Sequence, residues 1–304
     1  MTKEATLFSV LPMELGLNMV PKFLAEEAHI PNTGPLDWRP GADRTGSQRS
    51  LIEMLPGARQ SLGSVGPDEC FAAAAWTAEE INQILKDEGH GNIKLRPWDD
   101  PETFGVAGGV LFDWYWKTPG GGTYKVLDWR KGSRFASGVS FFTFEERVVA
   151  AIPTQRKSDF VFVAEAGNYV SRFALIEECT RVHRGMQATT EYEGAILPQW
   201  AIEPMQVDVS DLVGLNAQDS CKNPRIISQA VFGGENSFRR DGTHFKAAFA
   251  AAAMKGGLGY DEPGPKDWVA ETDLIVWYVR KGASQLLGAV YAPTDIFSRE
   301  EVYR

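Results

Sequence analysis

The chain has 304 residues, of which 43% are hydrophobic and 23% charged, a composition typical of a globular protein with a large core. Its formal net charge of -9 argues against nucleic acid or an anionic membrane as the main partner. The sequence contains no apolar run long enough to span a bilayer and no pattern of a cleavable signal peptide. We therefore expect a cytoplasmic protein, while a processed, secreted form stays open.

Cysteine and histidine residues offer little sign of metal or nucleophile chemistry. The three cysteines have no CxxC pair and no metal-type spacing, and their sparse, odd number favours a reducing compartment. The four histidines are scattered, so we expect no metal and no cofactor. Cys179 and His183 lie four positions apart on an expected helix and share a face, but a partly buried cysteine beside an exposed histidine explains them better than a nucleophile with its base.

In chain order, the first third mixes helix and loop signals. Residues 7–20 predict a short apolar helix with Ser9 as a possible cap, and residues 30–50 predict a loop because they are polar and rich in Gly and Pro. Residues 71–86 predict a helix, since an alanine run leads into an amphipathic stripe. Residues 104–116 predict a strand.

Strand patterns dominate the middle of the chain, and the C-terminal end combines strands with a loop. Expected strands cover 124–127, 139–144, 148–152, 160–163, 195–203, 226–232, 274–279 and 285–291, and an expected helix covers 171–184. Between the strands lie an alanine-rich run at 247–253 and a segment rich in Gly and Pro at 256–265. The composition of that segment predicts an exposed loop that is easily nicked by proteases.

Several motifs follow one another in a family-specific order. Ser228 and Gln229 stand at a characteristic distance before Gly242 and Thr243, and residues 287–293 read Leu-Gly-Ala-Val-Tyr-Ala-Pro. The pattern resembles the serpins, the serine protease inhibitor family, and places Trp116 on the tryptophan of their central strand. The resemblance implies one α+β domain over residues 1–304. It would have a large mixed β-sheet holding 106–116 and 226–232, a smaller one holding 274–279 and 285–291, packed helices and an exposed C-terminal reactive-type loop at about 242–268.

The hinge of that loop departs from the family pattern. In serpins a protease cuts the loop, and the hinge then enters the main sheet as a new strand. The resemblance assigns the hinge to Gly242, Thr243, Phe245 and Phe249. Side chains alternate along a strand, so Thr243, Phe245 and Phe249 share the face that turns inward. Phe245 stands where serpins have alanine, and overpacking costs about 1–3 kcal/mol per site, so we expect side-chain bulk to oppose insertion.

Two further departures concern the opening of the sheet. Gly108 and Phe232 stand where serpins carry the asparagine and histidine that help to control this opening, which predicts a sheet that stays closed. Counting on from Gly242 places a scissile region on the residues Lys255, Gly256, Gly257 and Leu258.

These patterns favour a non-inhibitory serpin-like protein that binds a small ligand or a protein partner. The first alternative is a working inhibitor of serine or cysteine proteases that acts through residues 242–268. The aromatic residues Trp114, Trp116 and Trp129 could line a ligand cleft. Asp113 and Asp128 beside them could have raised pKa values and act as acid or base. An enzyme with acid-base or shape-directed chemistry on the same scaffold is therefore the second alternative.

Overall fold

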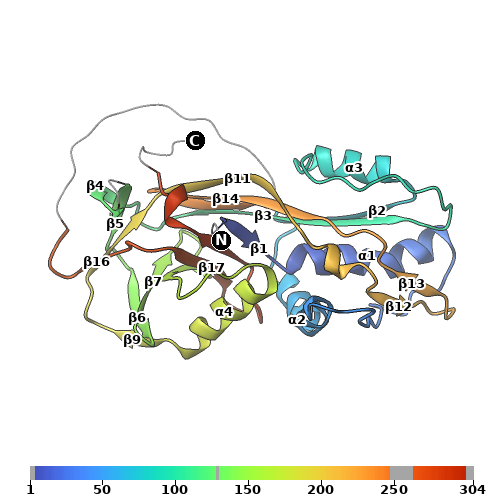
Figure 1. The fold of residues 1–304 in the computed structure, drawn as a ribbon, viewed down its shortest axis with the longest axis horizontal. Helices are drawn as coiled ribbons and strands as arrows, with labels where there is room; N and C mark the ends of the chain where they lie inside the picture. Colours follow the sequence, from blue (N-terminus) through green and yellow to red (C-terminus); the bar gives the residue numbers. More distant parts are fainter. Residues whose placement is uncertain (1–3, 128–129, 247–262, 299–304) are drawn as a thin grey trace.

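The computed structural model describes residues 4–127, 130–246 and 263–298 (Figure 1). This part of the chain contains four α-helices and eighteen strands, which form an α+β fold of three larger sheets and a two-stranded ribbon. Asp128, Trp129, Phe249 and residues 255–258, all named above as site candidates, lie outside the described residues.

The helices agree with the sequence at three of four places. They are α1 (Leu11–Glu27), α2 (Ser47–Leu62), α3 (Ala78–Asp87) and α4 (Arg172–Gly185). The predicted helix over residues 7–20 is confirmed only from Leu11, because residues 7 and 8 belong to strand β1 and Val10 is the N-cap. Ser9 Oγ still accepts a hydrogen bond from the Leu11 amide at 3.3 Å. Helix α4 confirms the prediction for 171–184, whereas α2 begins inside the expected loop at 30–50.

The predicted helix over residues 71–86 is wrong in its first half. Residues Cys70–Ala75 form strand β2, which pairs with β3 (Gly105–Tyr115) along its whole length. Helix α3 begins only after Thr77, where Thr77 and Glu80 form a capping box. The alanine run favours a helix locally, but the ladder with β3 overrides this weak preference.

A five-stranded antiparallel sheet has the order β11-β14-β15-β3-β2. Its remaining members are β11 (Trp200–Val207), β14 (Phe232–Phe238) and β15 (Gly242–Lys246). The strand predicted at 226–232 is displaced, because pairing with β11 begins only at Phe232. Helices α1 and α3 lie on opposite faces of this sheet at the end where β2 is found (Figure 1).

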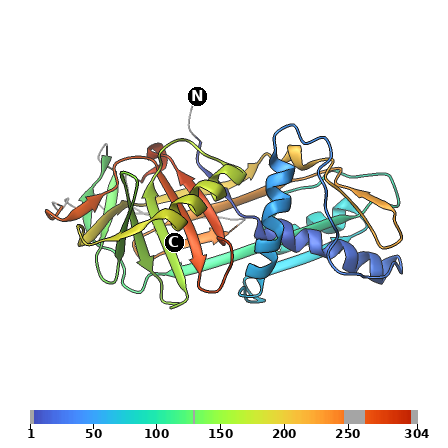
Figure 2. The same ribbon diagram turned by 90° about the horizontal axis from the view of Figure 1, so that it is seen from below.

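A seven-stranded sheet has the order β1-β18-β17-β8-β7-β6-β9, and α4 packs across it (Figure 2). Its strands are β1 (Thr6–Phe8), β6 (Ser140–Phe144), β7 (Arg147–Pro153), β8 (Asp159–Glu165), β9 (Gln187–Thr189), β17 (Leu274–Arg280) and β18 (Gly288–Ala292). The C-terminal hairpin is confirmed, although its second strand begins at Gly288 instead of residue 285. The hairpin belongs to the sheet with more strands, so the expected order of the two sheets by size is wrong.

The remaining strands form a four-stranded sheet and a ribbon. The sheet β16-β10-β5-β4 contains β4 (Gly121–Lys125), β5 (Lys131–Phe135), β10 (Gly194–Pro198) and β16 (Asp267–Val269), and the ribbon contains β12 (Asn216–Gln218) and β13 (Pro224–Ile226). Strands β10 and β11 confirm the prediction for 195–203, with a break at Gln199.

The core lies between the five-stranded and the seven-stranded sheets. Trp114 of β3 stacks on Tyr278 of β17 with ring centroids 4.5 Å apart. Phe232 of β14 packs against Phe8 of β1 at 5.0 Å. Both sheets therefore present aromatic side chains to a shared interior, and β15, which lies between β3 and β14, must fit this layer.

Candidate functional site

Strand β15 lies in the middle of the five-stranded sheet. It pairs with β14 from Thr243 to Lys246 on one side and with β3 from Gly242 to Lys246 on the other. The expected hinge residues Gly242, Thr243 and Phe245 are therefore part of the sheet in the intact chain. The predicted loop boundaries, 242 and 268, are wrong at both ends, since residues 242–246 form β15 and residues 267–269 form β16.

A tight turn at residues 239–241 brings the chain from β14 into β15. Fully buried Trp116 supports this turn, because its indole Nε1 donates to the Arg239 carbonyl at 2.8 Å. The Trp116 amide also donates to the Asp241 carbonyl at 3.0 Å. The tryptophan that the sequence motif singles out thus fixes the turn that leads into β15.

Phe245 is fully buried in β15, so the expectation that its bulk keeps the hinge out of the sheet is wrong. Its ring packs on Tyr278 with centroids 5.1 Å apart. Gly288 of β18 provides the space, because a Cβ placed on Gly288 would lie 2.5 Å from the Phe245 ring. A missing side chain on one sheet therefore compensates for a large one on the other.

Thr243 and the His244 carbonyl of β15 contact a buried polar network. Thr243 Oγ1 lies 3.2 Å from the Tyr278 hydroxyl, and Asn236 Nδ2 donates both to that hydroxyl and to the His244 carbonyl at 2.7 Å. The Trp200 indole donates to Asn236 Oδ1 at 2.9 Å. Burial raises the pKa of Tyr278 despite these hydrogen bonds, so the phenol stays protonated. Without β15, Asn236 and Tyr278 would each lose a buried partner, which is costly.

The opposite face of β15 carries a histidine between two carboxylates. His244 Nδ1 lies 2.7 Å from Asp113 Oδ1 on β3, and His244 Nε2 lies 3.2 Å from Glu235 Oε1 on β14. Burial disfavours the charged imidazole, but the hydrogen bonds to Asp113 and Glu235 outweigh it and raise the pKa of His244. Both ring nitrogens are engaged, so this imidazole cannot take a proton from a substrate without breaking a bond. The arrangement gives no support to Asp113 as a catalytic acid or base.

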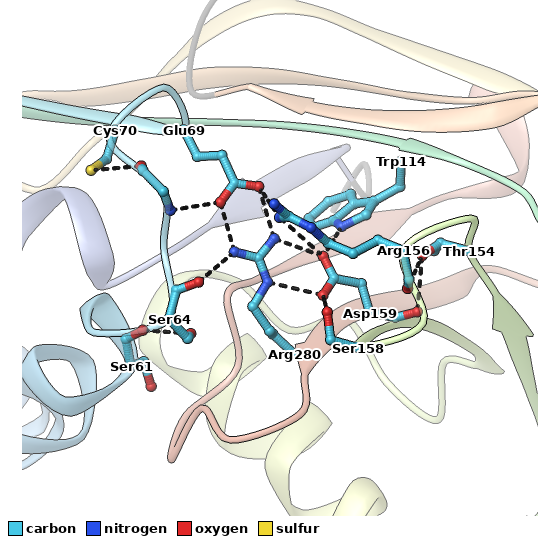
Figure 3. Close-up of polar contacts among 11 residues, drawn as sticks. Ser61, Ser64, Glu69, Cys70, Trp114, Thr154, Arg156, Ser158, Asp159 and Arg280 are labelled. Carbon is cyan, nitrogen blue, oxygen red and sulfur yellow. Dashed lines mark hydrogen bonds and ion pairs between the residues drawn. The ribbon is translucent and has the colours of Figure 1, made fainter.

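Trp114 of β3, the strand beside β15, is hydrogen-bonded to an ion-pair cluster (Figure 3). Its indole donates to Asp159 Oδ2 at 2.7 Å. Arg280 donates to both oxygens of Asp159 at 2.9 and 2.7 Å, to both oxygens of Glu69 at 2.7 and 2.8 Å, and to the Ser64 carbonyl at 2.8 Å. These five hydrogen bonds use all five N–H groups of the guanidinium.

The charges of this cluster hold one another in their ionised forms. Burial works against the charge of Glu69, but hydrogen bonds from Arg280 and the Gly66 amide, with the nearby charge of Arg156, bring its pKa down to about 2. The cluster joins β17, β8 and the segment before β2 to Trp114 of β3. It thereby connects the strand that borders the hinge to the seven-stranded sheet.

The predicted ligand cleft on the tryptophans is wrong for the two that are described. Trp114 and Trp116 are 5% and 0% exposed and belong to the packed core. Reasoning from sequence missed Asn236, Tyr278 and Arg280, since nothing local marks them. His244 and Gly288 carried weak signals: His244 alternates with the inward-facing hinge residues, and Gly288 belongs to the closing motif.

A pocket of about 440 Å³ lies beyond the end of β15. Its lining includes Gly105–Gly108 of β3, and Phe232 and Gly233 of β14, which are the parts of both neighbouring strands that β15 does not reach. Side chains of α1, including Leu17 and Val20, line it as well. Among the described strands, β3 and β14 pair with β15 and not with each other, so the sheet is already parted here.

Gly108 and Phe232 have structural roles of their own at this pocket. A Cβ on Gly108 would collide with the Pro12 carbonyl and the Gly16 amide of α1, so only glycine lets the helix approach β3 this closely. Phe232 packs on Phe8 of β1. The expectation of a closed sheet fails for the described strands, because β15 already separates β3 from β14.

Cys179 and His183 of α4 are the remaining pair named from the sequence. Cys179 is fully buried, which raises the pKa of its thiol well above the usual range, and the Trp277 indole donates to His183 Nδ1 at 3.4 Å. Within residues 4–127, 130–246 and 263–298, no group of three or more His, Cys, Asp or Glu is placed to hold a metal ion. In the same ranges, no helix combines the length and hydropathy needed to cross a membrane.

Comparison with solved structures defines the class of fold. Cleaved Serpin 42Da matches with a TM-score of 0.56 and 11% identity, covering 95% of this chain and 91% of that chain. The thermophilic serpin tengpin in its native state matches with 0.55 and 13%, covering 97% and 89%. Thyroxine-binding globulin in complex with thyroxine matches with 0.53 and 10%, covering 95% and 92%. No family model and no curated protein matches the sequence.

The chain therefore has the serpin fold in a divergent form, as the sequence motifs predicted. Strand β15, which carries the residues that the resemblance assigns to the hinge, lies between β14 and β3.

Proposed function

We propose that this protein is a protease inhibitor of the serpin type, in which the segment between β15 and β16 is cut and then extends β15 within the five-stranded sheet. The observation that carries this proposal is that Phe245 is buried and packs against Gly288 in the intact chain. Because the first hinge residues are already paired on both sides, cleavage needs only to lengthen an existing strand. Lengthening a strand avoids the cost of parting a closed sheet.

The sequence after Lys246 suits such an extension. Six of the seven residues at 247–253 are alanine, and small side chains enter a packed layer at low cost. Continuing the register of β15 by three residues would bring Phe249 beside Gly108 and Phe232, at the pocket beyond the strand. The pocket supports this path because it offers apolar space where the second large side chain would arrive.

The direct test is to mix the intact protein with an equimolar amount of a trypsin-like protease, since Lys255 lies in the counted scissile region. We expect a covalent complex that survives denaturing gel electrophoresis, together with loss of protease activity. The matched control is the same protease with its active-site serine blocked. Cleavage within residues 247–262 by several serine and cysteine proteases, without any stable complex, would contradict the inhibitory function.

The same pocket supports a second candidate, a non-inhibitory protein that binds a small apolar ligand. Its volume of about 440 Å³ lies in the range of small-molecule sites, and one similar solved structure is a complex with thyroxine. A thermal-shift screen of small apolar compounds tests this function. A compound that stabilises the intact chain and loses its effect in Leu17→Trp, which would fill the pocket, favours the ligand-binding function over the inhibitory one.

A further inference from the structure

His244 is the only member of β15 whose described side chain bonds to both neighbouring strands. Its two ring nitrogens face carboxylate oxygens at 2.7 and 3.2 Å. A neutral imidazole has one N–H donor and one acceptor, whereas the imidazolium has two donors. Only the charged form can therefore donate to Asp113 and Glu235 at once. In the neutral form one nitrogen lone pair would face a carboxylate oxygen, and that contact becomes repulsive.

We propose that His244 is a pH-sensitive latch that holds the hinge strand β15 between β3 and β14 when the imidazole is protonated and loosens this strand when it is neutral. The latch consists of His244, Asp113 and Glu235. The imidazolium bonds to a carboxylate on each neighbouring strand, so its charge opposes the separation of β15 from β3 and from β14. A strand held by a titrating bridge of this kind is a two-state element that pH can bias.

The surroundings of His244 leave the histidine as the group that changes charge near neutral pH. The titratable and charged residues at neighbouring positions are Asp113 and Tyr115 of β3, Glu235 of β14, Lys246 of β15 and Arg239 in the turn between β14 and β15. Of the residue types gathered here, histidine alone has an ordinary pKa between about 6 and about 8. Glu235 has a side chain that is 7% exposed, which leaves its carboxylate dependent on a protein partner.

The sign of the effect follows from the raised pKa of His244. Stabilisation of the paired state is complete below the ordinary value of 6.5 and is lost as the pH rises through the higher value in the sheet. The latch concerns the strand on which the proposed inhibitory function rests. Its test needs no protease, so a failure of the latch leaves loop insertion unaffected, and a failure of insertion leaves the latch unaffected.

Hydrogen exchange measured by mass spectrometry on the intact protein tests the latch. Amide protection in a peptide covering residues 242–246 is compared at about pH 6 and about pH 8, after scaling for the intrinsic exchange rate. Loss of one charge-assisted hydrogen bond predicts protection that is roughly tenfold lower at the higher pH. Strand β17 serves as the internal reference, and we expect its scaled protection to be unchanged.

Two variants separate the latch from general pH effects. In His244→Gln, which cannot become charged, protection of residues 242–246 should no longer depend on pH. The matched control His183→Gln should behave like the wild type. If His244→Gln does not fold, Asp113→Asn removes one side of the bridge and should reduce the pH dependence. Equal scaled protection of the wild type at both pH values would overturn the proposal, as would a pH dependence that persists in His244→Gln.

Discussion

The Phe245 ring in β15 occupies the space that a side chain at position 288 of β18 would need. The two residues lie 43 positions apart on different sheets, and an added Cβ at Gly288 would come within 2.5 Å of the Phe245 ring. This relationship reverses the expectation drawn from Phe245 alone. In the structure, the large side chain of Phe245 is matched by the missing side chain of Gly288, so β15 fits between β3 and β14 without small residues at every position.

Gly288→Val is predicted to destabilise the intact protein and to disturb β15. The added side chain overpacks the contact with Phe245, at a cost of about 1–3 kcal/mol in the free energy of unfolding. Chemical denaturation measures this cost. The double variant Phe245→Ala with Gly288→Val should recover part of this loss, because alanine at position 245 leaves room for the valine at position 288.

Gly121→Val is the matched control for that experiment. Gly121 lies in a strand, and a Cβ there would meet nothing within 4 Å, so we expect a change of less than about 0.5 kcal/mol. Equal effects of the two glycine replacements, or no recovery in the double variant, would show that Phe245 and Gly288 are not energetically coupled.

Asn236→Ala is predicted to destabilise the protein by about 2 kcal/mol or more. The substitution removes the acceptor of the buried Trp200 indole and a donor to Tyr278, and a buried polar group left without a partner costs about 1–3 kcal/mol. Thermal and chemical denaturation report this loss. Asn32→Ala, at an exposed position, is the control, and a loss in Asn236→Ala no greater than in the control would contradict the network's importance.

Arg280→Met is predicted to cost about 3 kcal/mol or more, because it leaves fully buried Asp159 and partly buried Glu69 with only the half-exposed Arg156 as a cation. The double variant Arg280→Met with Asp159→Asn should be more stable than Arg280→Met alone, since one uncompensated charge is gone. Denaturation midpoints compare the two proteins. A double variant that is less stable than the single one would argue against charge as the cause.

Acid stability should report on Glu69 of the same cluster. Its pKa of about 2 lies below the ordinary 4.5, so its stabilisation is present above about pH 4.5 and is lost as the pH falls towards 2. The difference in unfolding free energy between wild type and Glu69→Gln should therefore shrink over this range. Glu26→Gln, at an exposed position, should show no comparable trend, and a constant difference for Glu69→Gln would refute the assignment.

The sequence predicted the fold class and most strands because their signals are local. Continuous apolar runs rich in β-branched and aromatic residues mark β7, β8 and β17, and the order of motifs indicates the fold class. The alanine run at the start of the predicted helix 71–86 favours a helix locally. It forms strand β2 because it pairs with β3, a contact that the local sequence does not indicate. The strand at 226–232 was placed too early, since Gly233 and Gly234 break the apolar pattern inside β14.

The site was less accessible to prediction because its parts meet only in the folded chain. Alternation along the expected hinge correctly placed Thr243 and Phe245 on the inward face. Sequence alone gives no link between Phe245 and Gly288, and none between His244 and the carboxylates of Asp113 and Glu235. Each of these contacts joins residues from different strands. Their effect on how β15 fits into the sheet therefore differs from what each residue suggests by itself.

Under the proposed function, β15 is the beginning of a strand that cleavage can extend. The most direct measurement is the melting temperature of the protein before and after a protease cuts within residues 247–262, with both fragments retained. Extension of β15 into the apolar pocket adds backbone pairing on two sides and buries alanine side chains, so the cut protein should melt at a markedly higher temperature than the intact one. An unchanged or lower melting temperature after complete cleavage would contradict the claim.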